Sequence, residues 1–124
     1  MHSREEIESM RAKVVGILGT LPEVEVRPPT NEHNKFTIRG KSIAYYLVDH
    51  HGDGRLAFTC KAAPGMQDAL VHEDPERYFV PPYVGPGGWV GIELNDATDW
   101  ELVESLARDA YRLQAPKRLA ALVP

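Results

Sequence analysis

The segment from Asp49 to Gly54, with the sequence DHHGDG, has residue types and spacing that could bind a metal ion. Aspartates at its first and fifth positions and a glycine at its sixth imitate the start of an EF-hand calcium loop. Such a loop requires a bidentate glutamate at its twelfth position, which is Cys60 in this chain. His51 also stands where an oxygen ligand belongs. We therefore interpret the segment as a hairpin turn.

Cys60 is the single cysteine and could act as a metal ligand or a nucleophile together with a histidine. His50, His51 and His72 are the nearest candidates, but no pair among these residues has zinc-finger spacing. Cys60 alternates with apolar residues of a predicted strand, which predicts a buried and inert thiol. The serines lie in no nucleophile-elbow sequence. We therefore predict no catalytic residue, no metal and no cofactor, and a protein that is not an enzyme.

Residues 79–94, FVPPYVGPGGWVGIEL, combine prolines, glycines and large aromatic side chains. Residues 85–88 fit a type II turn, because Pro86 is at the second position and a glycine at the third. A strand is expected after the turn, and the lysine and hydroxyl of a Walker motif are absent, so a phosphate loop is excluded. Tyr83 and Trp89 could stack on a nucleobase or pack beneath the turn, and the sequence leaves both interpretations open.

The composition is typical of a globular chain: 124 residues, of which 43% are apolar and 26% charged. This length predicts one domain over residues 1–124. No apolar run is long enough to span a bilayer, and the charged N-terminal residues do not resemble a secretory signal. A single cysteine excludes an internal disulfide framework. We therefore expect a cytoplasmic protein with no membrane partner.

The charge is distributed unevenly. The net charge is −4 with histidine neutral, which is unfavourable for binding a polyanion. From Arg108 to Pro124, however, the chain carries four basic residues and one acidic residue. This asymmetry indicates either an anion-binding face or cations that complement the C-terminal dipole of a helix.

The hydrophobic periodicity predicts an α+β fold with about five antiparallel strands in a meander. Helical spacing and a Ser3–Glu6 capping box predict an N-terminal helix over residues 3–18. A short middle helix is expected at residues 66–72, and a C-terminal helix after a capping box of Thr98 and Glu101. The expected strands, separated by glycine or proline turns, are residues 24–27, 36–38, 42–49, 56–60 and 89–94.

The two faces of this sheet are predicted from the alternation in residues 42–49. Ile43, Tyr45 and Leu47 share one face, and Ala44, Tyr46 and Val48 share the other. We expect the face with Tyr46 and Val48 to be the exposed one, where a partner or a second copy could pair.

Five segments of the chain, taken in order, resemble proteins of the MmcQ/YjbR family. They are FTIRGKSIA (36–44), LAFTCK (56–61), PPYVGPGGWVGIEL (81–94), DW (99–100) and AYRLQAPKRL (110–119). The resemblance covers about residues 21–119. Family members often carry Ser-Tyr where this chain has Ala110-Tyr111, so no role is assigned to a hydroxyl at residue 110.

The resemblance implies an α+β domain whose antiparallel sheet is backed by helices, similar to type III secretion chaperones and the YjbR-like fold. It also implies a DNA-binding role through two hairpin wings. Carried onto this chain, that role falls to basic residues of the turns and the C-terminal segment, which are Arg39, Lys41, Lys61, Arg112, Lys117 and Arg118. The resemblance further suggests that the C-terminal segment and the aromatic loop with Tyr83 and Trp89 form one surface.

Two functions from different classes therefore remain open. The first is binding of DNA or another anionic ligand through the basic residues. The second is a non-catalytic module that binds a protein partner or a small ligand on the exposed sheet face, as a monomer or a weak homodimer.

Overall fold

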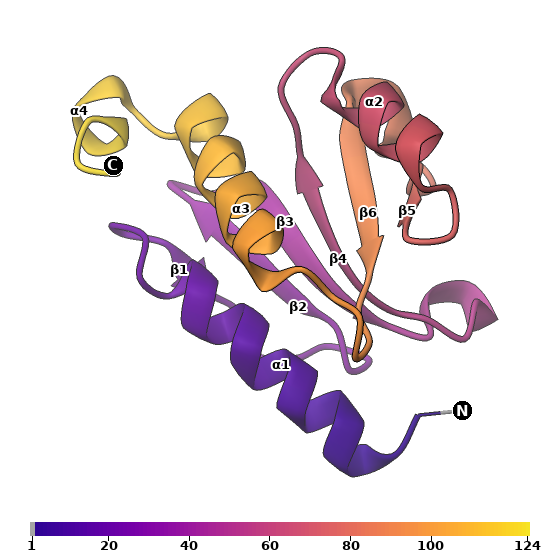
Figure 1. Cartoon of the computed structure of the whole chain (residues 1–124). Coiled ribbons are helices and arrows are strands. Elements are labelled where there is room, and N and C mark those ends of the chain that lie inside the picture. Colours follow the sequence, from indigo (N-terminus) through magenta and orange to yellow (C-terminus); the bar gives the residue numbers. More distant parts are fainter. Residues whose placement is uncertain (1) are drawn as a thin grey trace.

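The structure is a computed structural model that describes residues 2–124 and contains one six-stranded antiparallel sheet (Figure 1). The strands lie in the order β1-β2-β3-β4-β6-β5. The elements are α1 (Arg4–Leu18), β1 (Glu25–Val26), β2 (Asn34–Ile38), β3 (Lys41–Val48), the 3-10 helix η1 (His50–Gly52), β4 (Leu56–Lys61), α2 (Met66–Glu73), β5 (Tyr78–Phe79), the 3-10 helix η2 (Gly85–Gly87), β6 (Trp89–Glu93), α3 (Trp100–Gln114) and α4 (Lys117–Ala120). This architecture confirms the predicted α+β class, and the two-residue β5 is the strand that the sequence did not indicate.

The helix boundaries follow from local capping. The Ser3 hydroxyl accepts a hydrogen bond from the Glu6 amide, and the Glu6 carboxylate accepts one from the Ser3 amide, so the predicted capping box is present. At α3 the prediction is wrong by one residue, because Asp99 and not Thr98 is the N-cap. The Asp99 carboxylate accepts from the first-turn amides, whereas the Thr98 hydroxyl accepts from the Asn95 amide of the preceding turn.

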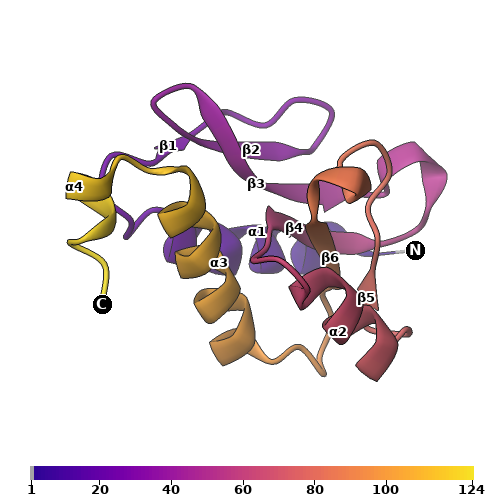
Figure 2. The same ribbon diagram turned by 90° about the horizontal axis from the view of Figure 1, so that it is seen from above.

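Helices α1 and α3 lie side by side on one face of the sheet (Figures 1 and 2). Between them and the sheet is a core of fully buried side chains, among them Val14, Phe36, Tyr46, Phe58 and Tyr111. The two tyrosine hydroxyls donate to backbone carbonyls, Tyr46 to Ile7 at 2.8 Å and Tyr111 to Pro22 at 2.8 Å. These bonds satisfy polar groups at the margin of the core and tie the sheet and α3 to the segment around α1.

A β-bulge decides which residues of β3 face the helices. Phe36 pairs with Ala44, but Thr37 pairs with Ser42, so Ile43 is the extra residue. As a result both Ile43 and Ala44 are buried on the helix side, and the alternation resumes with Tyr46 inward.

The prediction that the face with Tyr46 and Val48 is exposed was therefore wrong. Tyr46 is fully buried, and burial raises its pKa to about 12. Tyr45 and Leu47 lie on the face opposite the helices, together with Thr59 of β4 and Trp89 of β6. We call this side of the sheet the open face.

The segment between β5 and β6 forms a 3-10 helix where a type II turn was predicted. The left-handed residue is Gly88, with φ of 85°, and not the glycine at 87. Before it, Tyr83 has φ of 68°, a conformation that bulky residues rarely adopt. No helix within residues 2–124 is long and apolar enough to cross a membrane.

Alanine substitutions at two glycines are expected to have opposite effects on stability. A Cβ on Gly91 of β6 would collide with the Phe79 ring, which crosses the open face at this point. A Cβ on Gly16 of α1 would meet nothing within 4 Å. Gly91→Ala should lower the free energy of unfolding by about 1–3 kcal/mol through overpacking. Gly16→Ala should raise it by about 0.5–1 kcal/mol, since alanine is the better helix former. Urea denaturation of both variants tests this packing, and an unchanged stability in Gly91→Ala would contradict it.

Candidate functional site

Basic residues from separate segments gather at one end of the sheet. The β2–β3 hairpin turns at Arg39-Gly40, with positive φ at both residues (50° and 82°), as a two-residue type I′ turn requires. Arg39 Nε donates to the Glu23 carboxylate at 2.8 Å. That bond, with smaller contributions from the charges of Arg39 and Arg118, lowers the pKa of Glu23.

The C-terminal segment joins the same end. The Gln114 amide at the end of α3 donates to the Ser42 carbonyl beside the turn, and Pro116 then redirects the chain into α4. Lys117 and Arg118 are exposed on α4, which lies at the same end as the β2–β3 turn in both views (Figures 1 and 2). Leu119 is buried and fixes α4 to the domain.

Lys61 and Lys41 lie on neighbouring strands at this end. Lys61 is the last residue of β4 and pairs with Trp89, while Lys41 is the first residue of β3. We call Arg39, Lys41, Lys61, Lys117 and Arg118 the basic end. Within residues 2–124, four of these five side chains (all except Arg39) form no ion pair.

Arg112, the sixth predicted residue, is engaged elsewhere. Its guanidinium pairs with Asp109 at 3.0 Å and donates to the carbonyl oxygens of Val123 and Pro124. It therefore holds the end of the chain against α3. The role is structural, but it differs from the sequence-based alternative, in which the C-terminal cations complement a helix dipole.

The aromatic loop lies away from α4. The last residues, 122–124, line a hollow with the end of α1 and with α3, whereas η2 and the aromatic loop are on the opposite side of the molecule in both views (Figures 1 and 2). Lys117 and Arg118 thus do not stand beside Tyr83, so the expected shared surface is not present. Trp89 is 8% exposed and packs against Tyr45 at 5.7 Å between ring centroids, but Tyr83 is 83% exposed.

Beneath Tyr83 is a cavity of about 270 Å³ between the loop and the open face. Tyr45, Leu47 and Thr59 of the sheet form its floor. The other lining residues are His50 and the loop residues Pro81, Pro82, Tyr83 and Val84. The loop itself is anchored by Gln67 of α2, whose amide donates to the carbonyls of Gly85 at 2.8 Å and Trp89 at 2.5 Å.

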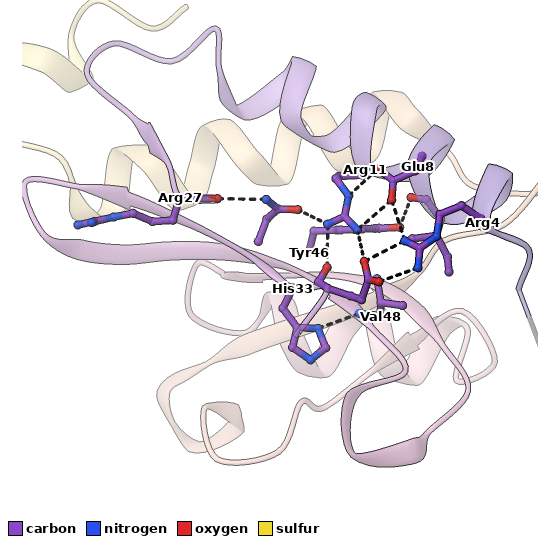
Figure 3. A network of polar contacts seen from close by, with 10 residues as sticks. Arg4, Glu8, Arg11, Arg27, His33, Tyr46 and Val48 are labelled. Atoms are coloured by element: carbon purple, nitrogen blue, oxygen red, sulfur yellow. Dashed lines mark hydrogen bonds and ion pairs between the residues drawn. The ribbon is translucent and has the colours of Figure 1, made fainter. Parts of the chain in front are cut away.

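A second polar cluster surrounds the buried Arg11 (Figure 3). Its guanidinium makes five hydrogen bonds, to both carboxylate oxygens of Glu8, to the carbonyl and carboxylate of Glu32, and to Asn34 Oδ1 at 2.5 Å. Arg4 adds a bidentate pair with Glu32 at 2.7 and 3.0 Å. Since all five N–H donors of Arg11 are used, no donor is left for a ligand. The cluster is a structural clamp that joins α1 to the turn before β2.

Three histidines continue from this clamp toward the aromatic loop. The ring of His33 lies 5.3 Å from that of His50, His50 lies 4.1 Å from His51, and His51 lies 5.8 Å from the Tyr83 ring. The Val48 amide donates to His33 Nδ1 at 3.0 Å, as seen in Figure 3. Burial, and then the nearby charge of His50, lower the pKa of His33. The sequence did not indicate this row, because His33 comes from a different turn.

The candidate chemistry of Cys60 is removed by its environment. The thiol is fully buried and makes a weak 3.9 Å contact with the Leu106 carbonyl. Burial raises its pKa far above the usual range, so the thiolate that nucleophilic attack requires is not formed. In the described part of the chain, no group of three or more His, Cys, Asp or Glu side chains could hold a metal ion.

Comparison with known proteins identifies the family of this chain and a similar structure. The model of the YjbR family matches residues 19–113, and the chain therefore belongs to the YjbR family. Its structure is similar to a crystal structure of the Deinococcus radiodurans protein DR2400, a DUF419 domain, with a TM-score of 0.65 and 23% sequence identity. That similarity covers 81% of this chain and 74% of the other. None of the curated proteins matches the chain. The family resemblance is confirmed, while α1, Lys117 and Arg118 lie outside the matched residues.

The lowered pKa of His33 predicts a pH dependence of stability. The unfolded chain binds a proton at His33 more readily than the folded protein, because only the folded state buries the ring and uses Nδ1 as an acceptor. The stabilisation is fully present above the unfolded pKa of about 6.5 and is lost as the pH falls through the lower folded value. Urea denaturation at about pH 7.5 and about pH 5.5 should show less stability at the lower pH.

The matched variant for this test is His33→Asn, whose side-chain oxygen can accept from Val48 without titrating. Carboxylates also titrate toward low pH, so the informative quantity is the difference between the wild type and the variant. An equal loss of stability in both proteins would show that His33 does not contribute.

Proposed function

We propose that this YjbR-family protein is a non-catalytic protein that binds DNA weakly and without sequence preference through its basic end. The observation that carries the proposal is that the β2–β3 turn, the end of β4 and α4 bring cations from three separate segments to one end of the sheet. Clustered lysine and arginine side chains are what phosphate recognition requires.

The distribution of acidic residues also favours the basic end as the place where a polyanion binds. Asp49 and Asp53 lie in the β3–β4 connection, at the opposite ends of these strands from Lys41 and Lys61. Asp96 follows β6 at that far end as well. A polyanion would be repelled from the far end and attracted to the basic end, although the net charge is −4.

Weak binding without sequence preference is expected for two physical reasons. Arg39 is already paired with Glu23, and Arg112 with Asp109, so both cations have an acidic competitor beside them. Phosphate contacts position a nucleic acid but carry no sequence information directly.

The edge strands β1 and β5 have two residues each, which leaves little edge for pairing with a second copy. We therefore propose that the protein acts as a monomer, in the cytoplasm as its composition suggests.

Removal of cations from the basic end should weaken binding and flatten its salt dependence. We expect Lys117→Ala/Arg118→Ala and Lys41→Ala/Lys61→Ala each to reduce the log–log salt slope by about one unit for each phosphate that is no longer neutralised. The Lys117→Ala/Arg118→Ala melting temperature should hardly change, since exposed charges contribute about 0–1 kcal/mol each. Fluorescence anisotropy with labelled DNA over a range of low salt concentrations measures the slopes.

The matched control removes two cations that lie outside the basic end. Lys13 lies over the Trp100 ring at 5.2 Å, and Arg77 pairs with Asp74 at 3.7 Å just before β5. Lys13→Ala/Arg77→Ala changes the net charge equally and should keep the wild-type salt slope. No binding by the wild type at micromolar protein and low salt would refute the proposed function. An equal loss in the control would show that net charge matters and the basic end does not.

A further inference from the structure

Tyr83 is an exposed aromatic residue in a backbone conformation that its side chain disfavours. Its φ is 68°, and the Val84 amide donates to the Pro82 carbonyl at 2.7 Å, so Tyr83 is the central residue of a tight three-residue turn. The ring is 83% exposed, and its aromatic neighbour within residues 2–124 is the edge of His51. Strained backbone conformations cluster at active sites and ligand-binding sites.

The cavity beneath Tyr83 has the character of a small ligand pocket. Its volume of about 270 Å³ is close to the lower end of the range for ligand pockets, roughly 300–1,000 Å³. Its walls are apolar at Leu47 and the two prolines. The polar groups of its lining residues are the His50 ring and the hydroxyls of Thr59, Tyr45 and Tyr83, and each can donate or accept a hydrogen bond. Such a pocket fits one planar ring system with polar edges.

The pocket is adjacent to the basic end along β4. Thr59 and Lys61 point to the same open face and are two residues apart, which corresponds to about 7 Å along a strand. Between them stands the aromatic pair of Tyr45 and Trp89. A planar ligand in the pocket would therefore place an attached anionic group within reach of Lys61.

We propose that the cavity beneath Tyr83 receives one unstacked base of single-stranded nucleic acid, with Tyr83 as the stacking surface and the adjoining phosphate at Lys61. This inference rests on the proposed function and names its ligand more closely. Duplex DNA keeps its bases inside the helix, so it would contact the basic end alone. Base stacking on aromatic side chains is tolerant of sequence, which agrees with binding that has no sequence preference.

The test compares three labelled ligands of equal length by fluorescence anisotropy at one low salt concentration. These are single-stranded DNA, the same strand with abasic sites throughout, and duplex DNA. The wild type should bind the intact strand about ten-fold more tightly than the abasic strand, which keeps the phosphates but has no bases. Tyr83→Gly should abolish this difference while leaving the affinity for the abasic strand unchanged.

The stability of Tyr83→Gly and a control variant make the result of this test interpretable. Glycine adopts a positive φ without strain, so Tyr83→Gly should fold at least as stably as the wild type. Val80→Ala is the control, because Val80 is 52% exposed in the same loop but does not line the cavity. This variant should retain the ten-fold preference.

Each other outcome has one meaning. Equal affinity of the wild type for intact and abasic strands would refute the base pocket and leave the proposed function standing. A preference that persists in Tyr83→Gly, or one that Val80→Ala loses equally, would also refute the pocket. Failure to bind all three ligands would refute the pocket and the proposed function together.

Discussion

The β-bulge at Ile43 is the constraint on which both the core and the candidate site depend. Side chains alternate along a strand, so one inserted residue exchanges the faces of every residue after it. The bulge turns Tyr46 toward α1, where its hydroxyl reaches the Ile7 carbonyl at 2.8 Å. The same shift turns Tyr45 and Leu47 outward, where they form the floor of the cavity beneath Tyr83. Without the bulge, the apolar residues of β3 would be divided differently between the two faces.

The parts of the fold that depend on neighbouring residues could be predicted from the sequence, and those that depend on strand pairing could not. The Ser3–Glu6 capping box is a local pattern and marks the start of α1 correctly. The bulge left no such pattern, because it is defined by the register between Thr37 and Ser42. The conformation of Tyr83 was missed for a related reason, since the residues that hold its loop, such as Gln67, come from α2.

The basic end gathers five of the six cations that the family resemblance indicated. Their gathering depends on the turn at Arg39-Gly40 and on the redirection of the chain at Pro116. What residue type could not reveal is which cations are already neutralised. Glu23 lies between α1 and β1, and only the folded chain brings it to Arg39. Arg112 likewise serves the chain terminus and not the basic end.

Left-handed backbone at two other places is offset by side-chain ion pairs, which Tyr83 cannot form. Glu32, with φ of 72°, is held by Arg4 and Arg11 through both its carboxylate oxygens. Arg39 and Glu23, with φ of 50° and 62°, pair with each other. In each of these cases the side chain gains a charged hydrogen bond that offsets the cost of the conformation, about 1–3 kcal/mol for a non-glycine residue. Within residues 2–124 the Tyr83 side chain gains an edge contact with His51 and no charged hydrogen bond, so the offset at this residue comes from the backbone bonds of its loop. The proposed base, stacked on the exposed ring above the open cavity, would add a further contact to this residue.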